Sequence, residues 1–282
     1  MKSILLKLTA LAITASMLFA FAACGNDSTD TPNTTNTAEA ASVQTTEPPA
    51  TEIPTETETA AESTEASTAP AEVSPVDDDA AALQLYNDAA NDIKLSKPSL
   101  HKKRDIIFKG LQKEIRWLAD MVNPFIPEGE NETYPAGTDY TSIFPAIGES
   151  WSSKLSLNDL NDISCTDNGD TYTIVLKLKD ETIPTNTTDY SQTIIGRAMA
   201  VNHTDEIRAG FGDAGTLSVC DQDYYNCSIS AVINKATGKM VSCYHELNLK
   251  MYLGGNYGLI TLNPDLVQPL LQITENYTEI TY

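Results

Sequence analysis

Histidine and cysteine are the side chains best suited to chemistry, and both are scarce here, with three histidines and five cysteines in 282 residues. His245 falls in an alternating apolar stretch, on the same predicted face as Cys243 and Leu247. A histidine in such a position is more often a hydrogen-bonded core residue than a catalyst. His203 precedes two carboxylates, at Asp205 and Glu206, but no second histidine follows at the spacing of metal ligands. We therefore expect neither a metal site nor a cofactor.

Motifs that would indicate an enzyme are incomplete. Gly148–Ser152 lacks the second glycine of a nucleophile elbow, and Ser99–Lys102 matches S-x-x-K without the partner motifs of penicillin-recognising enzymes. Walker loops, dinucleotide-binding glycine patterns, H-E-x-x-H and EF-hand loops are missing from the sequence. The carboxylate pair Asp221 and Asp223 would suit a glycosidase or a Ca²⁺ site, but such a pair is more typical of a solvated turn. We expect a protein without enzymatic activity.

Cys24 is the residue with the most specific assignment, because the stretch before it has the layout of a secretory signal peptide. Lys2 and Lys7 form a basic start, an apolar run follows over Leu8–Ala23, and Phe21-Ala22-Ala23 precedes the cysteine. A cysteine directly after small residues indicates a bacterial lipoprotein, in which the thiol is acylated, for example with palmitate. The sequence thus predicts a signal peptide over 1–23 and a membrane contact through lipidated Cys24.

Two alternatives to lipidation remain open. Ala20-Phe21-Ala22 also fits the cleavage site of a signal peptide that leaves a free, secreted protein. Ile4–Ala23 reaches about the 20 residues that span a bilayer, although Lys7 interrupts the run. All three interpretations place the rest of the chain on the extracytoplasmic side of the cell membrane.

Residues 24–79 form a segment that we expect to be a disordered tether. The segment has 13 acidic residues, no lysine, arginine or aromatic residue, and a composition dominated by Thr, Ala, Pro, Ser and Glu. Low hydrophobicity combined with one sign of charge leaves too little apolar surface to offset the entropy of ordering. Fully stretched, these 56 residues reach about 190 Å. The tether would lift a domain off the membrane through a cell wall, or be a filler of no selected length.

Residues 80–282 are expected to fold as one globular domain, because about 200 residues suffice to bury a proper core. This part keeps 26 acidic against 16 basic residues, a net charge of −10. An acidic domain argues against nucleic acid as a partner.

Two helices are predicted at the start of the domain. Ala82, Tyr86, Ala89 and Ile93 recur on one face of a helix over Ala80–Lys94.

An apolar stripe at helical spacing predicts the second helix, over about Lys102–Val122, with four basic residues gathered opposite the stripe. This cationic face is either a solvated surface or a contact for anionic lipid, wall polymer or an acidic partner. Its residues are Lys102, Lys109, Lys113 and Arg116.

From residue 156 the hydrophobic period changes from 3.6 to 2, which predicts strands. Asn168-Gly169 indicates a hairpin between the first two, and Tyr190–Phe211 is helical or irregular. The fold class is therefore α+β, with a twisted antiparallel sheet of about 5–7 strands packed by the N-terminal helices. The expected strands are Asn161–Cys165, Thr171–Lys179, Thr216–Cys220, Tyr225–Ile233, Met240–Leu253 and Val267–Tyr282.

The four cysteines after Cys24 allow three full pairings, and none has the C-x-x-C spacing of a zinc or redox site. Pairing Ile233 with Val241 sets Cys243 near Ala231, too far from Cys227 for a bond. A disulfide between Cys220 and Cys227 across a short turn is then the favoured bridge, with reduced, buried thiols as the alternative.

Several short stretches resemble an uncharacterised family of lipid-anchored lipoproteins in Gram-positive, clostridia-like bacteria. Together they touch most of the domain. They are Leu85-Tyr86-Asn87, Ile93-Lys94, Lys97-Pro98, Asp167–Asp180, Asn226-Cys227-Ser228-Ile229, Asn234–Met240 and Ile273–Tyr282. The resemblance implies an exported, lipid-anchored protein and carries over no catalytic residues.

The function expected is a lipid-anchored, extracytoplasmic, non-enzymatic binding or interaction protein, with a cell-wall polymer, a protein or a hydrophobic molecule as its ligand. The first alternative is a carrier of lipid or another hydrophobic ligand, with a half-open barrel wrapping helices, similar to LolA or LppX. The second alternative is a cell-wall-associated hydrolase, which would need converging Asp, Glu or His side chains in a cleft.

Overall fold

The computed structural model describes residues 74–282, apart from 115, 117, 118, 121, 122, 124, 125, 127, 128, 213 and 214. The predicted signal peptide, Cys24 and most of the predicted tether lie outside the described residues. Within them the chain forms an antiparallel sheet with helices, so the α+β class is confirmed. The helices and short 3-10 turns are α2 (Asp79–Ser96), η2 (Leu157–Asp159), η3 (Tyr190–Gln192) and α4 (Thr204–Gly210). The strands are β1 (Ser99–Leu111), β2 (Glu130–Tyr134), β3 (Leu160–Asp167), β4 (Thr171–Leu178), β5 (Glu181–Ile183), β6 (Gly215–Asn234), β7 (Met240–Tyr257), β8 (Ile260–Leu262) and β9 (Pro269–Thr281).

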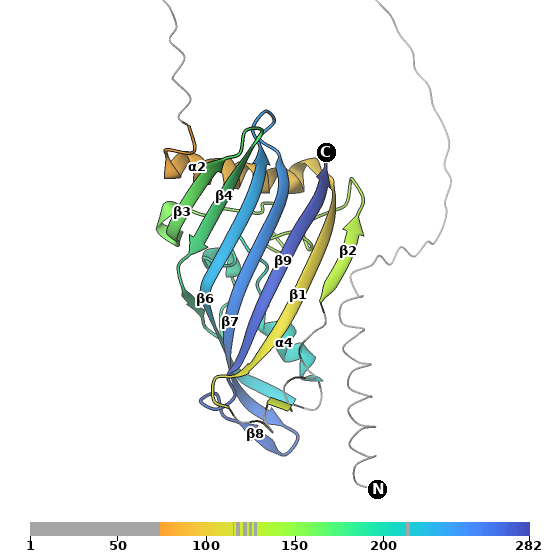
Figure 1. Cartoon of the computed structure of the whole chain (residues 1–282). Helices are drawn as coiled ribbons and strands as arrows, with labels where there is room; N and C mark the ends of the chain where they lie inside the picture. Colours follow the sequence, from red (N-terminus) through yellow and green to blue (C-terminus); the bar gives the residue numbers. More distant parts are fainter. Residues whose placement is uncertain are drawn as a thin grey trace, which may run out of the picture. The chain divides into compact units, whose positions relative to one another are not determined.

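The strands form one nine-stranded sheet in the order β2-β1-β9-β7-β6-β4-β3, with β5 added to β6 and β8 added to β7 (Figure 1). Every pairing in this sheet is antiparallel. The strand number exceeds the expected five to seven because β1 and β2 were not predicted as strands and because β5 and β8 are only three residues long.

The hairpins β3–β4 and β6–β7 form where the sequence predicted them. Gly169 takes a φ of 87° in the turn between β3 and β4, a conformation that glycine adopts without strain. Ala231 pairs with Cys243, as expected from the register of β6 and β7. The two strands predicted over 216–233 are one strand, β6, whose register shifts between Tyr225 and Ser228. Asn226 lies in that irregularity with a φ of 49°, so β6 bends there without ending.

The predicted second helix is wrong over its first half, because Ser99–Leu111 is strand β1. The apolar residues of this stretch fit a helix and a strand equally well, since Ile106, Ile107 and Phe108 are good strand formers. Pairing decides the outcome: β1 lies between β9 and β2 and pairs with β9 from Ser99 to Leu111. This tertiary context overrides the local helical pattern.

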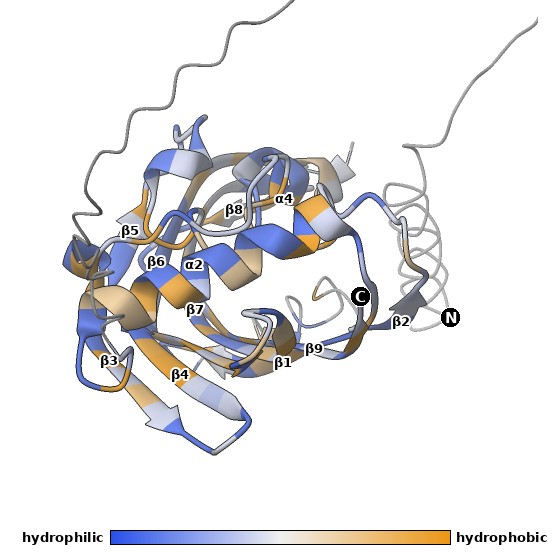
Figure 2. Ribbon diagram, turned by 90° about the horizontal axis from the view of Figure 1, so that it is seen from above, coloured by the Kyte–Doolittle hydropathy of each residue, from blue (hydrophilic) through white to orange (hydrophobic). Residues whose placement is uncertain are grey.

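Helix α2 matches the prediction and packs on one face of the sheet, which we call the inner face. The Asp78 carboxylate accepts hydrogen bonds from the amides of Ala80 and Ala81, at 2.8 and 3.2 Å, and caps the first turn. Its predicted apolar face is buried, with Tyr86 and Ile93 almost fully inaccessible. Figure 2 shows α2 crossing the strands on this side of the sheet.

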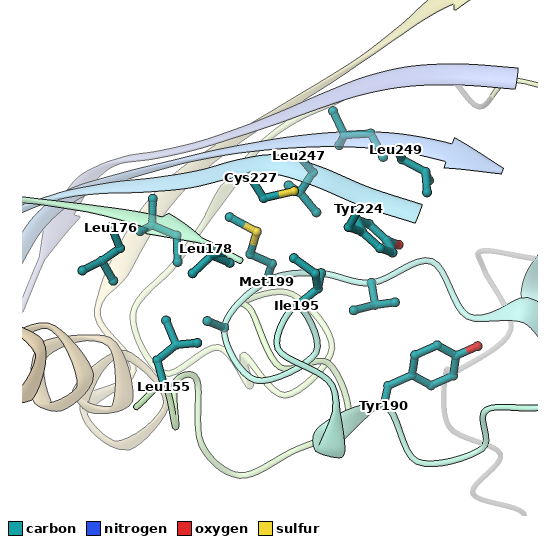
Figure 3. Packing of buried hydrophobic residues seen from close by; sticks show 14 of the residues in the cluster. Leu155, Leu176, Leu178, Tyr190, Ile195, Met199, Tyr224, Cys227, Leu247 and Leu249 are labelled. Atoms are coloured by element: carbon teal, nitrogen blue, oxygen red, sulfur yellow. The ribbon is translucent and has the colours of Figure 1, made fainter. Parts of the chain in front are cut away.

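Loop segments fill the rest of the inner face. Ile195 and Met199 project from the segment after η3 toward Leu247 and Leu249 of β7 (Figure 3). All four side chains are fully buried. One continuous core therefore lies between the sheet, α2 and these loops.

Polar side chains of α2 hold one of these loops in place. Asn87 and Asn91 bond to the backbone of residues 152–155 at 2.7–3.0 Å. The Lys94 ammonium is buried and donates to the carbonyls of Ala146, Glu149 and Trp151 at 2.9–3.0 Å. Residues at spacings of four and three share one side of a helix, so α2 binds the loop along a single edge.

No helix among the described residues is both long enough and apolar enough to cross a bilayer.

Candidate functional site

A cluster of charged side chains lies on the inner face, where core residues would be expected. Lys102 and Arg104 of β1, Glu275 of β9 and His245 of β7 all point to this face, because alternate residues of a strand share a side. Register brings them together: Glu275 pairs with Arg104 on one neighbouring strand and with His245 on the other. Lys102, His245 and Glu275 are buried.

The Glu275 carboxylate is the centre of this buried charge cluster and is fully inaccessible to solvent. Arg104 Nε lies 3.6 Å and Lys102 Nζ 3.9 Å from Oε1, and His245 Nδ1 lies 3.8 Å from Oε2. These distances exceed a direct hydrogen bond, so the attraction is electrostatic. The Tyr277 hydroxyl donates directly to Oε2 at 3.0 Å.

The electrostatics of the cluster keep Glu275 ionised. Burial by itself raises the pKa of Glu275, but His245, Arg104 and Lys102 outweigh it and lower the pKa to about 2. Lys102 has a second partner, because its ammonium lies 2.8 Å from a carboxylate oxygen of Glu130 on the edge strand β2. Each buried charge therefore has an opposite charge nearby, which such burial requires.

His245 connects the carboxylate to a thiol. Its Nε2 lies 3.2 Å from Cys243 Sγ, and the two residues share the inner face two positions apart on β7. Burial by itself lowers the pKa of His245, but Cys243 and Glu275 outweigh it and raise the pKa to about 9.

Thiol, imidazole and carboxylate stand in the order used by nucleophilic enzymes. In the folded domain Cys243 is only 1% exposed, and the Nδ1–Oε2 distance of 3.8 Å is too long for the orienting hydrogen bond. No substrate can reach this sulfur without movement of the covering core. The prediction that His245 is an inward-facing residue beside Cys243 is confirmed.

A set of neutral polar side chains adjoins the cluster at Arg104. Arg104 donates to the Asn202 side chain at 3.1 Å, and the Gln222 amide donates to the Asn202 carbonyl at 3.0 Å. Tyr224 in turn donates to Gln222 at 2.9 Å. Asn202 neighbours His203, which lines a surface hollow of about 120 Å³ together with Tyr190, stacked on its ring.

The structure separates the residues of the predicted cationic face. Lys102 belongs to the buried charge cluster, whereas Lys109, Lys113 and Arg116 are exposed. The correction has a simple cause: on strand β1 Lys102 points inward and Lys109 outward, so a face calculated for a helix does not exist over these residues.

The predicted disulfide is also wrong, because all four described cysteines are free. Cys220 and Cys227 lie seven residues apart on the continuous strand β6, which separates them by about 20 Å along the strand. A disulfide needs Cα atoms within about 7 Å. The alternative of buried thiols matches Cys220, Cys227 and Cys243, while Cys165 is half-buried.

Within the described residues, no group of three or more His, Cys, Asp or Glu side chains is arranged to hold a metal ion. No protein-family model, curated protein or solved structure matches this chain.

Sequence reasoning missed Arg104 and Glu275, and it assigned Lys102 to an exposed cationic face instead of the buried charge cluster. Glu275 lies between Ile273 and Tyr277 at alternate positions of one strand, so its inward orientation could have been predicted from the sequence. The inward orientation of Lys102 and Arg104 could not be predicted in this way, because the stretch that contains them was predicted as a helix.

Proposed function

We propose that this chain is a lipid-anchored protein of the extracytoplasmic membrane face, whose folded domain is a non-enzymatic binding module. The signal-like start, Cys24 and the acidic tether support the location. The observation that carries the binding role is the contrast between the two faces of the sheet. The inner face is filled by α2 and loops, whereas none of the described helices packs on the outer face, which is left to a partner (Figure 2).

The outer face has the composition of a polar recognition surface. On β7 it carries Tyr244, Glu246 and Tyr252, of which Tyr244 is exposed. Side-chain bonds already order it: Gln272 donates to Glu246 at 2.7 Å, and Tyr252 donates to Asp223 at 2.7 Å. Preordered tyrosines and amides lose little conformational entropy on binding, which favours their use in interfaces.

The buried charge cluster supports the same function by fixing the platform. A shift of β9 by one residue would move Glu275 to the outer face and leave its cations in the core without their carboxylate. Such a slip is costly, so the cluster specifies one register for β1, β9 and β7. We assign it a structural role in holding the outer surface in one arrangement.

The carrier alternative is favoured by the overall layout, a sheet that curves around a helix. The packing of the described residues argues against it. Among these residues, hollows of about 120 and 340 Å³ lie at the surface and are lined mainly by polar residues. The helix–sheet interface is packed with side chains, including Tyr86, Ile93 and Tyr277. A hydrophobic cargo would need a cavity lined by apolar groups.

Native mass spectrometry of the protein isolated from its own host distinguishes the two functions. A binding module without cargo gives the mass of the processed chain with its covalent acyl groups and nothing more. A recurrent further mass of a noncovalently bound lipid or other hydrophobic molecule would contradict this proposal and establish the carrier.

The hydrolase alternative has one specific observation in its favour, the Cys243–His245–Glu275 arrangement. It is tested by incubating purified protein with isolated cell walls and measuring released fragments. We expect no release above a heat-treated control. Release that is abolished by Cys243→Ser but kept in Cys165→Ser would make the protein an enzyme.

A further inference from the structure

The hairpin between β7 and β8 ends in apolar residues where polar ones are usual. Tyr257 pairs with Ile260, so Gly258 and Leu259 form a two-residue turn, with Gly258 at a φ of 58°. Leu259 at the apex is fully exposed, and Ile260 is 40% exposed. Two-residue turns favour Asn, Asp and Gly. Leu259 buries no apolar surface within the folded domain. Its side chain is therefore free to contact another molecule.

A third exposed apolar residue lies close to this hairpin in the chain. Leu266 is 38% exposed and belongs to the turn that leads from β8 to β9. Its neighbour Val267 accepts a hydrogen bond from the amide of Leu253 at 3.0 Å, which ties this turn to β7. Leu259, Ile260 and Leu266 are defined here as the apolar tip.

The C-terminal end of β1 lies at the same end of the sheet as the β7–β8 hairpin (Figure 1). The last residue of β1, Leu111, pairs with Pro269, and the amide of Gln112 donates to the Gln268 carbonyl at 2.9 Å. Lys109 and Lys113 flank this junction and are exposed. These cations therefore border the turn that carries Leu266.

We propose that the apolar tip, together with Lys109 and Lys113, inserts into the interface of an anionic lipid bilayer. Exposed leucine and isoleucine beside lysine are the combination that holds peripheral proteins at membrane interfaces. Each lysine close to an anionic surface adds favourable electrostatic energy, and each apolar side chain adds the free energy of leaving water. Both contributions come from the same end of the sheet (Figure 1).

A bilayer fits this surface better than a protein partner does. A stable protein interface buries about 800 Å² on each partner, and three side chains on turns supply only a fraction of that. Insertion of a few side chains into lipid requires no shape-matched groove. The small, protruding form of the tip is therefore suited to lipid.

The geometry is compatible with the proposed anchor, on which this inference partly rests. The chain enters the domain at α2, at the opposite end of the sheet from the tip (Figure 1). Strand β6, with 20 residues, spans about 65 Å, and the 56 residues of the predicted tether reach up to about 190 Å. The tether is long enough for the tip to meet the membrane that holds Cys24.

Vesicle binding of the chain from residue 25 onward tests the inference without the lipid anchor, while keeping every described residue. The probes are vesicles of phosphatidylglycerol and phosphatidylcholine in equal parts and vesicles of phosphatidylcholine alone. We expect flotation with the anionic vesicles, weakened about tenfold or more by Leu259→Asp. Lys113→Gln should weaken it about fivefold.

A matched control is Leu95→Asp, because Leu95 is 76% exposed on α2 at the other end of the sheet. It should bind vesicles like the unchanged protein. In a Leu259→Trp variant the emission should shift to the blue on anionic vesicles, which reports insertion into lipid. The chain from residue 25 lacks Cys24, so the assay reports on the tip independently of the anchor.

Three outcomes would overturn the inference. They are no binding to anionic vesicles, equal binding by the Leu259→Asp variant, and binding without a blue shift by the Leu259→Trp variant. Binding to an anionic wall polymer that survives Leu259→Asp, with no vesicle binding, would assign the end of the sheet to a polymer instead. If the chain from residue 25 does not bind vesicles but the full protein is still attached to the membrane through Cys24, the apolar-tip inference is wrong and the proposed lipid anchor is retained.

Discussion

Glu275 is the residue on which the buried charge cluster depends, because Lys102, Arg104 and His245 all lie within 3.9 Å of its carboxylate. If this charge were removed, the Arg104 guanidinium and the His245 imidazole would lose their carboxylate in a core of low polarity, and Lys102 would keep only Glu130. Breaking such a set at one member is costly even where the intact set contributes little net stability.

Glu275→Gln should lower the free energy of unfolding by about 3–5 kcal/mol, measured by urea denaturation. The control is Glu246→Gln on the outer face, where the carboxylate is half-buried and bonded to Gln272. That control should change stability by no more than about 0.5 kcal/mol. A loss below about 1 kcal/mol in Glu275→Gln would refute the view that this carboxylate neutralises the cluster.

The pH dependence of stability should contain a contribution from His245. Its pKa is raised from 6.5 to about 9 in the folded state, so its stabilisation is complete below pH 6.5 and lost as the pH rises through 9. The contribution is at most about 3 kcal/mol. Burial lowers the pKa of Lys94 to about 8, which makes stability rise with pH between about 8 and 10.5 and so opposes the trend.

The difference between the unchanged protein and His245→Asn isolates the histidine from Lys94. Urea denaturation at pH 6, 8 and 10 should show a stability gap that shrinks toward high pH. A gap that stays constant over this range would contradict a raised pKa at His245.

At the scale of elements, α2 does more than cover the sheet, because its polar edge fixes the loop over residues 146–155. Lys94 replaces water at three carbonyls that would otherwise be buried without partners. Helix α2 therefore has two roles: its apolar side packs on the sheet and its polar side holds this loop.

Lys94→Met should lower the free energy of unfolding by about 2–4 kcal/mol, because the carbonyls of Ala146, Glu149 and Trp151 lose their donor. Gln84→Met is the matched control, since Gln84 is exposed on the same helix and bonds only to Asp88 in the next turn. Amide hydrogen exchange should also rise over residues 146–155 in the Lys94 variant alone. Unchanged protection there would show that α2 does not hold this loop.

Prediction from sequence succeeded where local signals decide the element and failed where distant pairing decides it. Helix α2 has caps and a period of 3.6, and the β3–β4 hairpin has Asn168-Gly169. Strand β1 becomes a strand by pairing with β9, about 170 residues later, and nothing local records that partner. The buried charge cluster was not predicted for the same reason, because Lys102 and Arg104 approach Glu275 only through the pairing of β1 with β9.

At the scale of the whole molecule, the folded domain and the segment before it should respond differently to proteolysis. A protease that cuts after glutamate should cleave within 24–79, which is rich in acidic residues, before it attacks the domain. Mass spectrometry of the first products should show a stable fragment that begins near residue 73–80. Protection inside 24–79 would contradict a disordered tether.

Attachment of the mature protein through Cys24 is the claim on which the location, the tether and the apolar tip all converge. The direct test compares the unchanged protein with Cys24→Ala in the native host, by membrane fractionation in carbonate and by mass analysis of the N-terminal peptide. We predict that the unchanged protein stays in the membrane pellet with an acylated Cys24, and that the Cys24→Ala protein is released. An unmodified Cys24, or persistent attachment of the Cys24→Ala protein, would contradict the lipid anchor.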